Sequence, residues 1–93
     1  MAKKSKINMD FDVVIGNLLR STRESHNFSR EKLLVKDINN LISLDTLKRY
    51  EKGTTTASFF GMLLIFQCME LEEKEVIKFI EIALKYLDSL TKS

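Results

Sequence analysis

Few side chains in this sequence have the chemistry of an enzyme. The chain contains one histidine, His26, and one cysteine, Cys68, which lie 42 positions apart. One histidine and one cysteine cannot make a zinc site without several carboxylates, and the sequence has no glycine-rich phosphate loop. Cys68 lies in an apolar stretch with no histidine nearby, so we expect a buried structural thiol and not a nucleophile. The sequence therefore predicts no enzyme, no metal site and no cofactor.

The distribution of charge favours a polyanionic partner for one part of the chain. Residues 20–53 contain eight lysines and arginines against five acidic residues, whereas residues 54–93 contain four against six. The net charge of the 93-residue chain is only +2. The uneven distribution, with a basic middle and an acidic end, would suit a protein that binds phosphate with one face. A scatter of solvated charges would give a similar pattern, and both interpretations stay open.

The composition fits one small helical domain. The chain has no proline and only three glycines. Three lysines near the N-terminus are followed by no apolar run, so no secretory signal is predicted. The most apolar stretch, residues 59–69, is too short to cross a bilayer. A single cysteine excludes an intrachain disulfide, and we expect a cytoplasmic protein without a membrane segment.

The spacing of apolar residues predicts five helices and no strand. They are expected over residues 11–25, 30–37, 44–52, 59 onward and 72–90. Ser29, Ser43 and Ser58 are good N-caps for the second, third and fourth helices, and Gly53 can take the left-handed conformation that ends the third. The fourth helix is apolar nearly all round, which is typical of a helix in the middle of a core.

The last expected helix carries two apolar seams. One seam follows a spacing of four, three, four and three residues, and Phe79 belongs to the neighbouring seam. One seam can cover the core of the chain, and a second copy of the same chain is the simplest partner for the other seam. In the alternative interpretation, a compact core uses both seams. The residues predicted for a homodimer interface are Val76, Phe79, Ile80, Ala83, Leu87 and Leu90.

Two stretches resemble a known family. IGNLLRSTRESHNFSREKLL, residues 15–34, and SLDTLKRYEKG, residues 43–53, are similar to the Cro/C1-type (lambda-repressor-like) helix-turn-helix family of phage and bacterial repressors. The matching positions are Arg20, Arg23, Ser29, Leu33, Leu47, Tyr50, Glu51 and Gly53. The resemblance covers roughly residues 11–70. It implies a compact, all-α, five-helix lambda-repressor-like domain with the helix-turn-helix at its second and third helices.

The expected division of the chain follows from these observations. Residues 1–10, with Lys3, Lys4 and Lys6, would be a flexible basic N-terminal arm. Residues 11–70 would be the helix-turn-helix domain, and residues 71–93 a C-terminal apolar helix for dimerisation.

The resemblance implies a sequence-specific regulator of transcription, a repressor that binds double-stranded DNA as a homodimer on a palindromic operator. The family places the exposed face of the third helix in the major groove. At the base edges this would place Ser43, Leu44, Asp45 and Thr46, with Lys48 and Arg49 further along the helix. The implied phosphate contacts are Arg30, Lys52, Thr54 and Thr55, and Arg23 would form a structural ion pair with Glu51.

Several alternatives remain open at this point. Asp45 is equally a favourable first-turn residue, because a negative charge suits the positive end of a helix, and Thr46 is equally a second capping ligand. The 22 positions from Ser29 to Glu51 exceed the family's usual length, so residues 36–43 either lengthen the second helix or enlarge the turn. The rival function is that of a protein-binding inhibitor or adaptor from a mobile element, with a protein partner in place of DNA.

Overall fold

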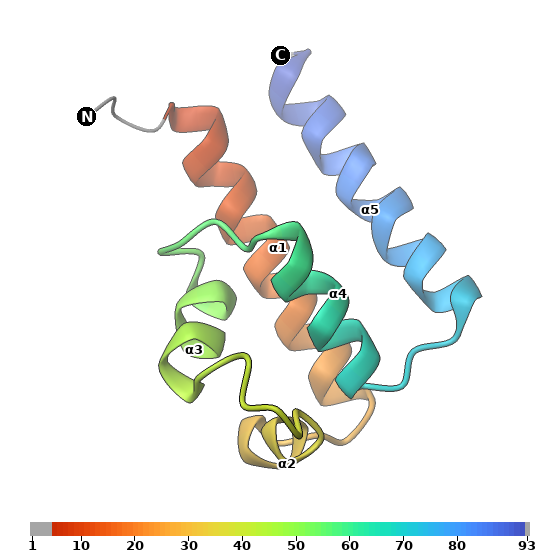
Figure 1. Ribbon diagram of the computed structural model, residues 1–93. Helices are drawn as coiled ribbons and strands as arrows, with labels where there is room; N and C mark the ends of the chain where they lie inside the picture. Colours follow the sequence, from red (N-terminus) through yellow and green to blue (C-terminus); the bar gives the residue numbers. More distant parts are fainter. Residues whose placement is uncertain (1–4, 93) are drawn as a thin grey trace.

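The computed structural model describes residues 5–92, and this part of the chain is all-helical (Figure 1). Its helices are α1 (Lys6–Ser25), α2 (Arg30–Val35), α3 (Leu44–Lys52), α4 (Phe59–Cys68) and α5 (Glu73–Thr91). The predicted all-α class and the five predicted helices are confirmed for the described residues. No helix among them is long and apolar enough to cross a membrane.

Hydroxyl caps begin most of the helices. At the start of α1, α2, α3 and α4, a serine side chain accepts a hydrogen bond from a backbone amide of the first turn. Such a bond satisfies one of the free amides that every helix start leaves. The predicted caps at Ser29, Ser43 and Ser58 are confirmed, and Ser5 is a fourth. α5 begins differently, with a reciprocal pair of bonds between Glu72 and Glu75.

α1 begins at Lys6 and not at Phe11, so the predicted flexible arm is wrong for residues 6–10. Ser5 Oγ accepts from the Asn8 amide at 3.1 Å and fixes the first turn. The Lys6 ammonium lies 3.9 Å from the carboxylate of Asp10, one helical turn later. Lys3 and Lys4 lie outside the described residues.

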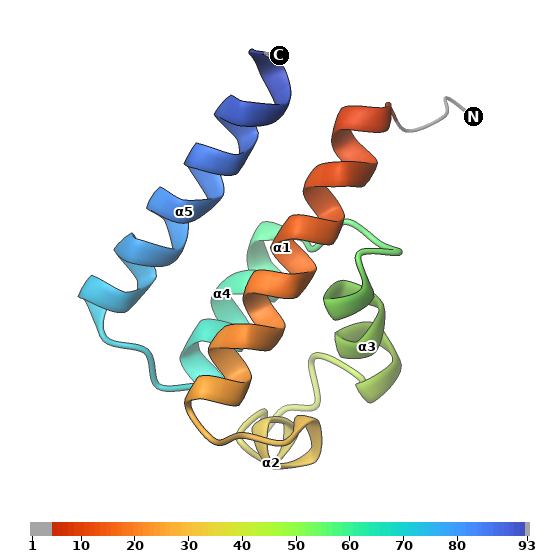
Figure 2. The ribbon, with the colours of Figure 1, turned by 180° about the vertical axis from the view of Figure 1, so that it is seen from behind.

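The core is assembled around α1. In Figure 1, α4 runs in front of α1, and the view from behind in Figure 2 shows α1 between α3 and α5. The largest fully buried side chains come from four helices and the residue after α4: Leu19, Leu33, Leu47, Ile65 and Met69. α5 joins this core through Phe79, whose ring meets Phe66 edge to face at a centroid distance of 4.8 Å.

α4 is less buried than the sequence predicted. Its inner side, with Ile65 and Phe66, lies in the core, but Phe59, Phe60 and Leu63 are exposed. The expectation that this helix lies in the middle of the core is therefore wrong. α4 packs against several neighbouring helices on its inner side, and the side that carries Phe59, Phe60 and Leu63 is exposed.

Two glycines bring α1 and α3 into backbone contact. A Cβ atom on Gly16 would lie 2.4 Å from the carbonyl oxygen of Tyr50 and 2.6 Å from that of Glu51. Gly53 ends α3 in the left-handed region, with φ 74°, and a Cβ atom there would lie 2.5 Å from Val13 Cα. The last turn of α3 is therefore fixed against α1 at a distance that side chains would prevent.

Candidate nucleic-acid interface

A buried ion-pair network holds α3 to α1 and α2. Arg23 Nε donates to Glu51 Oε2 at 2.7 Å, and Arg23 Nη2 donates to Glu51 Oε1 at 3.0 Å. Only 4% of Glu51 and 6% of Arg23 is exposed. The hydrogen bond from Arg23 to the Glu51 carboxylate is the main reason that the pKa of Arg23 is raised above its ordinary value. The ion pair implied by the family resemblance is present, in the two-pronged geometry that arginine and carboxylate favour.

Arg30 belongs to the same network. Its Nε donates to Glu51 Oε1 at 3.0 Å, and its side chain is about one quarter exposed, at 28%. The third guanidinium nitrogen of Arg23, Nη1, donates to the carbonyl of Phe28 at 2.8 Å. Arg30 therefore supports α3, and its phosphate contact stays a prediction.

The outer face of α3 carries mostly positive charge. Lys48, Arg49 and Lys52 are exposed, as is Asp45. Arg49 Nε lies 3.2 Å from Asp45 Oδ2, a one-turn ion pair on the surface. Asp45 therefore has an intrahelical partner, which fits its interpretation as a first-turn residue.

The hydroxyl groups at the two ends of α3 are engaged in the helix itself. Ser43 Oγ accepts from the Thr46 amide at 3.0 Å and donates to Thr46 Oγ1 at 2.9 Å. Thr54 Oγ1 donates to the carbonyl of Arg49 at 3.3 Å. Leu44 and Thr55 are half-buried. Thr46 is thus a partner of the cap, as one of the two sequence interpretations held.

The extra length between α2 and α3 lies in the turn. α2 ends at Val35, two residues earlier than predicted. Asp37 is 4% exposed, and its Oδ2 accepts from the amide of the buried Ile42 at 2.8 Å. This bond closes the loop in which Asn40 takes a positive φ of 52°. Sequence reasoning missed Asp37, although an aspartate two residues before a pair of asparagines is a typical turn signal.

Three of the residues predicted for a dimer interface on α5 face the chain's own core. Phe79 is 3% exposed, and Val76 and Ala83 pack against the core. Residues from both predicted seams therefore contact the chain's own core, in line with the alternative interpretation. Of the other predicted residues, Leu87 and Leu90 are half-buried, and Ile80 is about half exposed.

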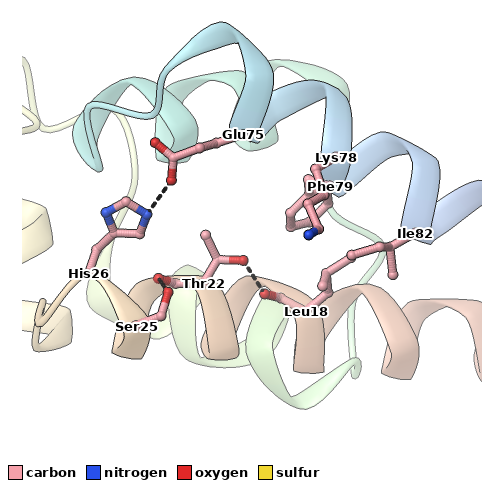
Figure 3. Close-up of a pocket in the computed structure, with 8 residues that line it drawn as sticks. All are labelled: Leu18, Thr22, Ser25, His26, Glu75, Lys78, Phe79 and Ile82. Carbon is pink, nitrogen blue, oxygen red and sulfur yellow. Dashed lines mark hydrogen bonds and ion pairs between the residues drawn. The ribbon is translucent and has the colours of Figure 1, made fainter.

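A hollow of about 190 Å³ lies between α1 and α5 (Figure 3). At its rim His26 Nε2 meets Glu75 Oε2 at 2.6 Å. The pKa of Glu75 is lowered, first by the hydrogen bond that it accepts from the Glu72 backbone and then by His26. The hydroxyls in the hollow are satisfied locally, because Thr22 donates to the Leu18 carbonyl and Ser25 to that of Thr22. The arrangement ties the start of α5 to the end of α1.

Cys68 is buried, and burial raises the pKa of its thiol. Residues 5–92 contain no group of three or more histidine, cysteine, aspartate or glutamate side chains that could hold a metal ion.

Comparison with known proteins gives no further guide to function. No family model, no curated protein and no solved structure matches the chain. Function has to be inferred from the residues and their geometry.

Proposed function

We propose that the protein is a transcriptional regulator, a repressor, that binds double-stranded DNA by placing α3 in the major groove. The observation that carries the proposal is the outer face of α3, where Lys48, Arg49 and Lys52 are exposed on a helix whose inner face is buried. The major groove of B-DNA is about 12 Å wide and admits one α-helix.

The contacts that hold α3 in place suit a recognition helix. Buried Glu51 and the backbone contact at Gly16 join its last turn to α1. Ser43 caps its first turn, and Asp37 closes the loop before it. A recognition element needs such rigidity, because base contacts depend on side chains held within a fraction of an ångström. Residues 43–46 would then approach the base edges, while cations further along would reach phosphates.

The ion pair between Asp45 and Arg49 refines the roles of the three cations. Asp45 offsets part of the charge of Arg49 in the free protein. DNA phosphate must compete with Asp45 for Arg49, whereas Lys48 and Lys52 are four residues apart on the same face. We therefore expect Lys48 and Lys52 to contribute more to affinity than Arg49. A twofold homodimer would place two copies of α3 in successive major grooves, about 34 Å apart on a palindromic site.

The test is the binding of the full chain to random-sequence duplex DNA at two or more salt concentrations, followed by selection of preferred sites. Removing both charges in Lys48→Gln/Lys52→Gln should reduce the slope of log affinity against log salt by about two units, near 0.9 for each lost phosphate contact. Lys78→Gln/Lys85→Gln on α5 is the matched control, since it removes the same charge from another exposed helix. An equal loss in both variants, or no DNA binding by the wild type at low salt, would refute the proposal.

A second candidate function is a protein-binding inhibitor or adaptor. The observation that favours it is the exposure of Phe59 and Phe60 at the start of α4, at 77% and 61%. Large exposed apolar patches on soluble proteins mark interaction sites. Binding through such a patch should change little with salt, whereas DNA binding should weaken steeply.

A further inference from the structure

We infer that Arg49 reads a guanine base and that Asp45 is the residue that positions it for this contact. This role rests on the proposed function and deepens it, because it names one base of the preferred site and the side chain that recognises it. Among the exposed cations of α3, Arg49 then provides specificity, whereas Lys48 and Lys52 provide phosphate contacts.

Asp45 and Arg49 lie along the middle of the outer face of α3. Each is two positions away from Leu47, whose side chain is fully buried. Two positions correspond to about 200° around an α-helix. The two side chains therefore project away from the core. In a helix whose outer face lies in the major groove, this is the direction of the base edges on the floor of the groove.

The charged end of Arg49 lies closer to the start of α3 than its place in the sequence suggests. Side chains of an α-helix lean toward its N-terminus. Arg49 Nε lies 3.2 Å from Asp45 Oδ2, one turn earlier, and Asp45 belongs to the first turn of α3. The guanidinium is therefore level with residues 43–46, which approach the base edges in the proposed complex.

The ion pair leaves the outer edge of the guanidinium available. Asp45 meets Arg49 at Nε, and no group of residues 5–92 forms a hydrogen bond or ion pair with Nη1 or Nη2 of Arg49. Arg23, by contrast, uses Nε and both Nη groups within the fold. Guanine presents O6 and N7 as neighbouring acceptors in the major groove, and two neighbouring N–H donors of an arginine match them.

Asp45 also gives Arg49 a reason to prefer a base to a phosphate. The pair carries no net charge, so phosphate attracts it less than it attracts Lys48 and Lys52, which have no ion-pair partner among the described residues. The side chains of Arg49 and Asp45 are 51% and 78% exposed, so the pair is weak in the free protein. In the groove, where water is partly excluded, the attraction between them is stronger. Asp45 therefore holds the guanidinium most firmly in the bound state.

The first experiment measures the affinity of the full chain for duplexes made from its selected site, with each base pair replaced in turn. For the wild type, replacing one guanine of each half-site should weaken binding on the order of 10- to 100-fold, the discrimination of a two-pronged arginine contact. Arg49→Lys keeps the charge but loses the planar fork. This discrimination should therefore vanish at that position alone, with an unchanged slope of log affinity against log salt. Arg20→Lys is the matched control, because Arg20 forms the same kind of one-turn pair with Glu24 on α1.

The second experiment tests the positioning role of Asp45. Asp45→Ala should lower the guanine preference and steepen the salt slope by up to about one unit, because the released Arg49 can contact a phosphate. In the Arg49→Gln background, Asp45→Ala should leave the salt slope unchanged, since Asp45 acts through Arg49. An equal steepening in both backgrounds, or a guanine preference that survives Asp45→Ala, would overturn the positioning role. Circular dichroism checks that each variant keeps its helices.

A failure of this inference can be told from a failure of the proposed function. If the wild type binds DNA with a salt slope that depends on Lys48 and Lys52, but Arg49→Lys keeps every base preference, Arg49 does not read a base. If Arg49→Gln loses a full unit of salt slope and no base preference, Arg49 is a phosphate contact. Either result overturns the inference and leaves DNA binding in place, whereas a wild type that binds no DNA at low salt refutes both.

Discussion

The strongest test of how α3 is held is the removal of Glu51. In Glu51→Ala, Arg23 keeps its charge but loses two hydrogen bonds, at 2.7 and 3.0 Å, and Arg30 loses one at 3.0 Å. Arg23 is 6% exposed, so water cannot replace the carboxylate without a rearrangement of α1 and α3. The change therefore leaves a buried positive charge without its partner.

The expected cost is large for a chain of this size. Breaking a buried ion pair on one side costs about 3–5 kcal/mol. A domain of 93 residues has a total stability of roughly 5–14 kcal/mol. The melting temperature should fall by at least roughly 12 °C, since each kcal/mol is worth about 4–8 °C in a domain of this length. Thermal unfolding followed by circular dichroism measures this shift.

The matched control removes a carboxylate from an exposed pair. Glu24 lies 3.3 Å from Arg20, and both side chains are more than half exposed. Glu24→Ala should change stability by less than about 1 kcal/mol. The double variant Arg23→Met/Glu51→Met should lose less than Glu51→Ala, because it leaves no buried charge. If Glu51→Ala melts within a few degrees of Glu24→Ala, the network does not anchor α3 and the reasoning is refuted.

Three further predictions concern the contacts around this network. Gly16→Ala should destabilise by about 1–3 kcal/mol or more in urea unfolding, because its Cβ meets the Tyr50 carbonyl oxygen at 2.4 Å; exposed Ser21→Ala on the same helix should be nearly neutral, and equal effects would contradict the close approach. Asp37→Ala should cost about 1–3 kcal/mol by leaving the buried Ile42 amide without its acceptor, and Asp37→Asn, which keeps an acceptor oxygen, should cost less; the reverse order would reject the loop closure. The lowered pKa of Glu75 means that its carboxylate stabilises the fold at pH values above its ordinary pKa of 4.5 and loses this effect as the pH falls through the lowered value. Glu75→Gln should therefore flatten the fall of the melting temperature with pH below about 4.5. An unchanged profile would exclude that role.

The sequence predicted those parts of the fold that local rules determine. Serine caps and helical spacing located α2, α3 and α4 to within two residues at their starts. The left-handed end at Gly53 follows from the same local chemistry. The start of α1 was missed because Ile7 and Met9 are exposed there and give no buried stripe to detect.

The parts that failed depend on which surfaces meet in three dimensions. Leu63 and Phe66 are both apolar residues of α4, yet the first is 45% exposed and the second 6%. Nothing in their types separates them, because burial depends on where α1 and α5 pack. The same holds for α5, where Phe79 lies in the core and Ile80, the next residue, is about half exposed. Periodicity identifies an apolar seam, but not the partner that covers it.

The long turn before α3 bears on whether the family resemblance can be transferred to residues 43–46. An enlarged turn could shift a helix that depended on α2 for its position. Here the last turn of α3 is held by α1, through the Arg23–Glu51 pair and the backbone contact at Gly16. The extra residues form a loop that Asp37 closes onto Ile42. The orientation of α3 is therefore set by contacts that the turn does not supply, and its outer face can serve the proposed DNA contact despite the added length.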